Sequence, residues 1–173
     1  MTWKNDDLVL YHGTDESAAQ AILSKGVDLK MCSQFTDFGS GFYTTTHLDQ
    51  AKNWASNRAI RIRARIPSAR GAVIEMRVNR DWISDLQALV FVRPARETGW
   101  EAFVRHCRNG LIPHKTSGNY DIVYGPVAQW QNLAPSFKIF VIADCDQVSF
   151  HNSVTTSHSS QLFAASSIIW TEL

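Results

Sequence analysis

Four short segments of this 173-residue chain carry side chains that could hold a flat, hydroxyl-bearing ligand. In Tyr11-His12-Gly13-Thr14, the imidazole can donate a hydrogen bond to a hydroxyl, the glycine permits close approach to the backbone, and the threonine adds a polar group. Taken alone, one histidine in a turn is more often structural than functional, so this segment needs support from others.

The other three segments lie further along the chain. The run Asp37-Phe-Gly-Ser-Gly-Phe-Tyr43 ends on a tyrosine whose ring could stack on a heteroaromatic ligand. Trp54 follows eleven residues later, where a tryptophan considered alone is more often part of a core. In Asp146-Gln-Val-Ser-Phe-His151, the Gln147 amide could bind a sugar hydroxyl or be an ordinary surface group. The glycine pattern is neither a dinucleotide fingerprint nor a Walker loop.

Composition is that of a globular protein, with 45% hydrophobic and 19% charged residues. We expect one domain over residues 1–173, because no repeat or linker divides the chain. The Ser/Thr-rich stretch 152–173 is expected to be a partly ordered C-terminal tail, with its apolar residues packed.

The expected environment is the cytoplasm. No apolar run reaches the length of a membrane helix, and the polar, acidic start predicts no secretory signal. The three cysteines are widely spaced without a CxxC pair, which argues against a disulfide framework, and no metal site is expected.

Positive charge is concentrated in one belt of the sequence. Residues 58–80 contain seven arginines and one glutamate, whereas acidic residues outnumber basic ones on both sides. The belt is either a solvated helix surface or a phosphate-contacting surface for a dinucleotide or a nucleic acid. The arginines are Arg58, Arg61, Arg63, Arg65, Arg70, Arg77 and Arg80.

Strands and helices are predicted without regular alternation, which favours an α+β fold over a doubly wound one. Three helices are expected. The first begins after a Thr14 cap and ends near Lys25, and the others span 49–65 and 98–108. Expected strands are 8–12, 41–46, 72–78, 120–124, 137–143 and 148–150.

Taken together and in order, these segments resemble the ADP-ribosyltransferase superfamily, and more narrowly a bacterial ADP-ribosyltransferase-like family first catalogued as a domain of unknown function. The resemblance covers most of the chain. Its blocks are Leu10-Tyr-His-Gly-Thr14, Asp37-Phe-Gly-Ser-Gly-Phe-Tyr-Thr-Thr45, Gln50-Ala-Lys-Asn-Trp-Ala55, Trp100-Glu-Ala-Phe-Val104, Tyr120-Asp-Ile-Val-Tyr-Gly-Pro-Val-Ala128 and Asp146-Gln-Val-Ser-Phe-His151.

The resemblance implies a fold of split antiparallel β-sheets that form an NAD cleft flanked by helices. It implies that His12 binds the 2′-hydroxyl of the adenosine ribose and that the Gly13 backbone binds the nicotinamide amide. Tyr43 would stack on the nicotinamide ring, and Trp54 would cover its other face. The implied NAD-binding set is His12, Gly13, Thr14, Gly41, Phe42, Tyr43 and Trp54, and the implied catalytic triad is His12, Tyr43 and Gln147.

Gln147 departs from relatives that carry a catalytic glutamate at this position. A glutamine can hydrogen-bond but supplies no negative charge beside the developing sugar cation, and one lost electrostatic contact costs about 10²–10³ in rate. Asp37, Asp144 or Asp146 could assist it. The departure favours transfer of a single ADP-ribose, NAD hydrolysis or weak activity.

The implied function is mono-ADP-ribosyl transfer from NAD to a macromolecule, protein or nucleic acid, by a bacterial toxin or effector with a cognate antitoxin or immunity protein. The alternatives are an NAD glycohydrolase, a degenerate NAD-binding or partner-binding module, and an RNA 2′-phosphotransferase on the same scaffold. The last is disfavoured because the loop before Gly39 lacks basic residues after Lys30.

Overall fold

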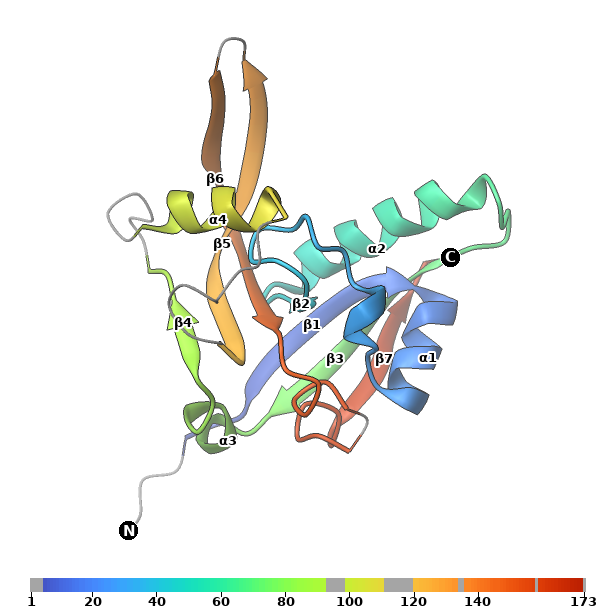
Figure 1. The fold of residues 1–173 in the computed structure, drawn as a ribbon. Helices are drawn as coiled ribbons and strands as arrows, with labels where there is room; N and C mark the ends of the chain where they lie inside the picture. Colours follow the sequence, from blue (N-terminus) through green and yellow to red (C-terminus); the bar gives the residue numbers. More distant parts are fainter. Residues whose placement is uncertain (1–4, 93–98, 111–119, 134–135, 158, 173) are drawn as a thin grey trace.

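The computed structural model describes residues 5–92, 99–110, 120–133, 136–157 and 159–172, with the backbone alone at 130–133 and 136–138. In these described ranges, seven strands form two sheets, and the helices pack around them (Figure 1). The expected α+β class is confirmed at this level. Among the described residues, no helix is both long enough and apolar enough to cross a membrane.

The first sheet is antiparallel and has the order β1-β3-β7. The second has the order β2-β6-β5-β4 and is antiparallel except for β4, which runs parallel to β5. The strands are β1 (Leu8–Asp15), β2 (Phe42–Thr44), β3 (Gly71–Val78), β4 (Ala88–Val90), β5 (Ile122–Leu133), β6 (Ser136–Phe150) and β7 (Ser166–Thr171).

Polar side chains cap some of the helices. Asp28 caps a short 3₁₀ helix, η1 (Leu29–Met31), and Asn79 caps α3. The helices are α1 (Glu16–Lys25), α2 (Leu48–Arg63), α3 (Arg80–Ser84) and α4 (Trp100–Arg108). As expected, α1 ends at Gly26, whose φ of 77° is accessible to a residue without a Cβ.

The two sheets meet where β1 and β2 come together. Tyr11 exchanges both backbone hydrogen bonds with Thr45, at 2.8 and 2.9 Å. This bridge holds the middle of β1 beside the end of β2, although Tyr11 and Thr45 are 34 residues apart in the sequence. The main core lies between the sheets and includes Leu10, Ile74 and Phe150, each with 0% of its surface exposed.

The structure differs from the expected elements in three respects. The cap of α1 is Asp15 rather than Thr14, because β1 continues to Asp15 and the Asp15 carboxylate accepts from the Ala18 N–H at 3.0 Å. The strands expected at 137–143 and 148–150 are parts of β6, which pairs with β5 across a bulge near Pro126. α3 and β4, of five and three residues, were not expected.

The C-terminal stretch contributes directly to the first sheet. β7 pairs with β3 along most of its length, so residues 166–171 complete the three-stranded sheet. Leu162 and Phe163, just before it, belong to the main core.

Glycine allows α2 to lie close to the first sheet. A Cβ on Gly13 would lie 1.9 Å from the carbonyl oxygen of Ala51, and one on Gly71 would lie 2.8 Å from the carbonyl carbon of Ala55. The buried alanines of α2 complete this contact. The missing side chain of Gly13 therefore makes room for α2, and contact between its backbone and a ligand stays a prediction.

We predict that Gly13→Ala destabilises the fold by at least about 3 kcal/mol, the upper end of the usual cost of overpacking. Gly99→Ala is the matched control. At Gly99 a Cβ meets nothing within 4 Å, and only its positive φ of 76° is unfavourable, at about 1–2 kcal/mol. Urea unfolding measures both variants, and equal losses would contradict the packing argument.

Candidate functional site

A cleft made of two adjoining cavities lies where β1, β2, α1 and α2 meet. The α2 cavity has a volume of about 580 Å³ and the α1 cavity about 730 Å³. They adjoin because His12, Thr36, Tyr43 and Arg58 line both. Volumes of this size suit small-molecule ligands. Together the cavities therefore offer room for an elongated ligand that bends around His12 and Tyr43.

Residues from six helices and strands, and from the loop before β2, line the α2 cavity. It contains four of the expected site residues, namely His12 on β1, Tyr43 on β2, Trp54 on α2 and Gln147 on β6. The Gly13 backbone also borders it. The remaining lining residues are Thr36, Asp37, Asn57, Arg58, Arg61, Arg108 and Val127.

His12 is held in one tautomer by the backbone of β2. Its Nδ1 lies 2.6 Å from the carbonyl oxygen of Tyr43, which can only accept, so Nδ1 carries the hydrogen. Burial lowers the pKa of His12 to about 4, more than the Tyr43 carbonyl and the Asp15 charge raise it. The ring is thus neutral near pH 7, and its Nε2 is an acceptor. A ligand hydroxyl would donate to His12, the reverse of the donation expected from the sequence.

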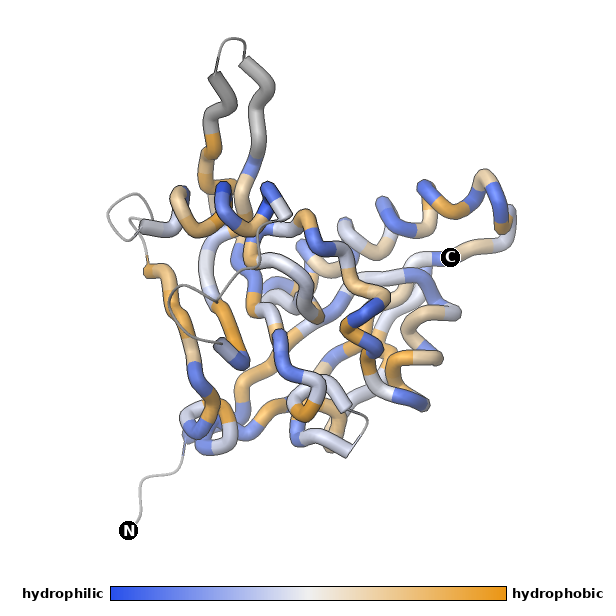
Figure 2. The backbone as a smooth tube through the Cα atoms, in the orientation of Figure 1, coloured by the Kyte–Doolittle hydropathy of each residue, from blue (hydrophilic) through white to orange (hydrophobic). Residues whose placement is uncertain are grey.

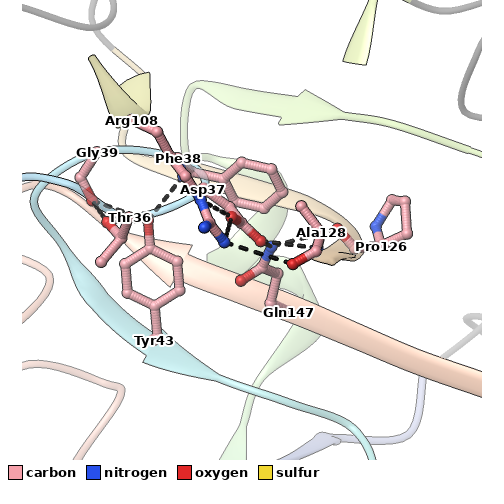
Figure 3. A network of polar contacts seen from close by, with 9 residues as sticks. All are labelled: Thr36, Asp37, Phe38, Gly39, Tyr43, Arg108, Pro126, Ala128 and Gln147. Carbon is pink, nitrogen blue, oxygen red and sulfur yellow. Dashed lines mark hydrogen bonds and ion pairs between the residues drawn. The ribbon is translucent and has the colours of Figure 1, made fainter. Parts of the chain in front are cut away.

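Tyr43 has its hydroxyl fixed by the preceding loop. The phenol oxygen accepts from the Phe38 N–H at 2.9 Å, donates to the Gly39 carbonyl at 2.8 Å and lies 2.8 Å from the Thr36 hydroxyl (Figure 3). Burial raises the pKa of the phenol above its usual range. Tyr43 therefore stays protonated near neutral pH. It offers an aromatic surface whose position is fixed at the hydroxyl end.

The centre of the polar network is the Asp37 carboxylate, which is 4% exposed. One oxygen accepts from Arg108, through its Nε at 2.6 Å and its Nη2. The other accepts from the Ala128 N–H at 2.8 Å and from the Gln147 amide at 2.7 Å (Figure 3). Arg108 also donates to the Ala128 carbonyl at 3.4 Å. The negative charge is thus paired and hydrogen-bonded on both oxygens.

Gln147 is oriented by this network. Its Nε2 donates to Asp37 and to the Pro126 carbonyl at 3.2 Å, so both amide hydrogens have acceptors. Within the described part of the chain, Oε1 has no hydrogen-bond partner, and Gln147 lines the α2 cavity. The atom left to bind a ligand is therefore Oε1, which carries the partial negative charge of the amide.

One face of α2 forms a wall of the cavity. Trp54, Asn57, Arg58 and Arg61 are spaced three or four residues apart, which places them on one side of the helix. Trp54 is half-buried and is not in a core cluster, so the interpretation as a core residue is wrong. Within the described ranges, the one ion pair of Arg58 is a 3.5 Å contact with Asp15.

The other expected ligand-binding residues lie in different surroundings. Gly41 and Phe42 line the α1 cavity, where Phe42 packs its ring 4.4 Å from that of His12. Gly41 has no room for a side chain, because a Cβ would lie 2.7 Å from the His151 ring. Thr14 is buried and lines neither cavity. The structure gives no support for a ligand contact by its side chain.

Of the three acids considered as helpers, only Asp37 contacts Gln147. Asp146 faces away and binds Thr45 and Thr46, with hydroxyl contacts at 2.7 and 2.5 Å. It lines a separate cavity with Asp144. Sequence analysis gave no role to Arg108, which pairs with Asp37 across 71 residues, because no local spacing marks such a pair.

The chain belongs to the family described as "Protein of unknown function (DUF3990)", which it matches over residues 8–169. That span contains every residue that lines the two cavities. No curated protein and no solved structure matches the chain. Membership therefore assigns no activity, and the function has to be argued from the cleft.

We predict that His12 stays neutral and Nδ1-protonated until the pH falls to about 4. In the unfolded chain a histidine takes a proton near pH 6.5, so acidification from 6.5 to 4 favours unfolding through this residue. NMR of the ring nitrogens, assigned with His12→Asn, measures tautomer and pKa. Titration between pH 6 and 7 would contradict this description.

Proposed function

We propose that this protein is a mono-ADP-ribosyltransferase that cleaves the nicotinamide–ribose bond of NAD and transfers ADP-ribose to a macromolecule. The observation that carries the proposal is the meeting of His12, Tyr43, Trp54 and Gln147 in one cavity, although they come from four elements. The two-sheet α+β architecture agrees with an ADP-ribosyltransferase fold.

The nicotinamide ring is assigned to the space beside Tyr43 and Trp54. Both side chains line the α2 cavity, and each offers an aromatic face to a flat, electron-poor ring. The hydrogen-bonded phenol of Tyr43 holds one side in place. A rigid stacking surface supports catalysis by holding the leaving group in a reactive orientation.

The adenosine end is assigned to the α1 cavity. Its lining is largely apolar and includes Ala18, Ile22 and Phe42. His12 lies at the junction of the two cavities, where its Nε2 would accept a hydrogen bond from a ribose hydroxyl. An elongated dinucleotide would then bend at His12 and reach both cavities.

The chemistry breaks the bond between ribose C1′ and the nicotinamide nitrogen, and the electron pair leaves with the ring. Positive charge develops on the sugar, and a nucleophile from the acceptor bonds to C1′ and releases its proton. The Oε1 of Gln147 supplies a partial negative charge beside that sugar. The charge of Asp37 is offset by Arg108, so the site has less stabilisation than a free carboxylate would give.

The second candidate is NAD hydrolysis with water as the acceptor. This candidate rests on the ion pair between Asp37 and Arg108, which leaves the acid beside Gln147 without a free charge. A weakly stabilised sugar cation is consistent with slow turnover by either route.

Nicotinamide release from NAD tests the proposal, measured by chromatography with and without cell lysate. Release that depends on lysate supports transfer, and release without lysate supports hydrolysis. We predict that Tyr43→Ala loses all release, because the stacking surface is gone. Circular dichroism and thermal unfolding confirm that the variant is folded. Full activity in folded Tyr43→Ala, or no release by the wild-type protein under either condition, would overturn the proposal.

We also predict that moving the negative charge from position 37 to position 147 accelerates nicotinamide release. Gln147→Glu alone places a second carboxylate against Asp37, at a contact that is now 2.7 Å, and should destabilise the network. The double variant Asp37→Asn/Gln147→Glu keeps one charge near Arg108. Its rate should rise by up to about 10²–10³ over the wild type.

The control for this experiment is Asp37→Asn alone, which removes the charge without relocating it. Rates are compared only after urea unfolding shows that each variant is folded. A folded double variant no faster than wild type would show that Gln147 does not act on the sugar.

A further inference from the structure

The outer face of α2 carries positive charge. The one acidic residue of this helix is Asp49 in its first turn. Between Asp49 and Glu75 the sequence contains no acidic residue. In Figure 1, α2 extends past the edge of the first sheet toward its C-terminal end, and Figure 2 shows hydrophilic segments at intervals along it. This helix begins at Leu48, borders the α2 cavity from Trp54 to Arg61 and ends at Arg63.

Most arginines of the belt are accounted for by other contacts. Arg63 pairs with Glu172 at 2.5 Å, Arg70 with Glu16 at 2.9 Å and Arg77 with Glu75 at 2.9 Å. Arg80 donates to the Asp6 carbonyl at 2.8 Å. These four stabilise the surface of the fold.

The remaining arginines form a row. Arg58, Arg61 and Arg65 are exposed and lie on one side of α2 and the turn that follows it. Among the described residues, Arg61 and Arg65 make no ion pair, and Arg58 makes only the long contact with Asp15. At 1.5 Å per residue the row is about 10 Å long, the span of roughly three successive phosphates in a stacked strand.

We propose that this arginine row binds the backbone of a single-stranded nucleic acid and guides it as the acceptor into the α2 cavity. The inference rests on the proposed function for the transfer step. Evenly repeated cations without intervening acids suit a polymer with regular phosphate charges, whereas one carboxylate acceptor would need a single arginine. A single strand is required because the reacting atom must enter a cavity, and duplex bases are stacked.

In the transfer step, an oxygen or nitrogen of the strand bonds to C1′ of the ribose. The bond from C1′ to nicotinamide breaks, its electron pair leaves with the neutral ring, and the proton of the strand passes to solvent. Arg61 borders the cavity and Arg65 lies beyond it, so a bound strand would run outward along α2.

Binding of a fluorescein-labelled, mixed-sequence single-stranded 12-nucleotide RNA tests the row without NAD, by fluorescence anisotropy at several salt concentrations. The double variant Arg61→Gln/Arg65→Gln should weaken binding about tenfold or more. It should also reduce the slope of log affinity against log salt by about 1.4, since each lost contact accounts for about 0.7.

The matched control is Arg77→Gln/Arg80→Gln, which also removes two positive charges, but from another surface. It should change affinity less than twofold. Equal weakening by both pairs, or no RNA binding by the wild type at low salt, would overturn the inference. Labelling of lysate proteins but not of RNA with NAD would also overturn it. Intact RNA binding without nicotinamide release would instead contradict the proposed function and leave the arginine row supported.

Discussion

The buried carboxylate of Asp37 is the interaction on which the candidate site depends. It joins the loop before β2 to the end of α4 through Arg108, to β5 through the Ala128 N–H and to β6 through Gln147. Tyr43 closes the same loop from the other side with its hydroxyl. Removing one partner of a buried ion pair costs about 3–5 kcal/mol, so this network is a strong constraint on the shape of the cleft.

The same constraint limits the chemistry. The acid nearest to Gln147 is committed to an arginine and two other donors, and the glutamine amide is committed to two acceptors. What the site offers a ligand is a neutral imidazole acceptor at His12, an amide oxygen and two aromatic side chains, with arginines at the rim. Such a set favours binding and orientation over strong stabilisation of a cation. For the proposed transferase activity, a slow, single transfer fits this set better than repeated addition.

Sequence patterns predicted the elements that have local signals. The apolar run at β1, the capped helix ending at Gly26 and the alternation in β3 were all read from neighbouring residues. The long hairpin of β5 and β6 was not, because the polar residues around Asp146 look like a break while their backbones still pair. The Asp37–Arg108 pair had no signal, since burial and a separation of 71 residues leave no spacing to detect. The packing role of Gly13 against α2 had no signal either, because contact between a helix and a distant strand is a tertiary feature.

A crystal structure of the protein soaked with NAD tests the central assignment most directly. The account predicts that the nicotinamide ring lies between the side chains of Tyr43 and Trp54, that a ribose hydroxyl donates to Nε2 of His12, and that the adenosine lies in the α1 cavity. Dinucleotide density elsewhere on the surface, or a cleft that excludes NAD at saturating concentration, would contradict it.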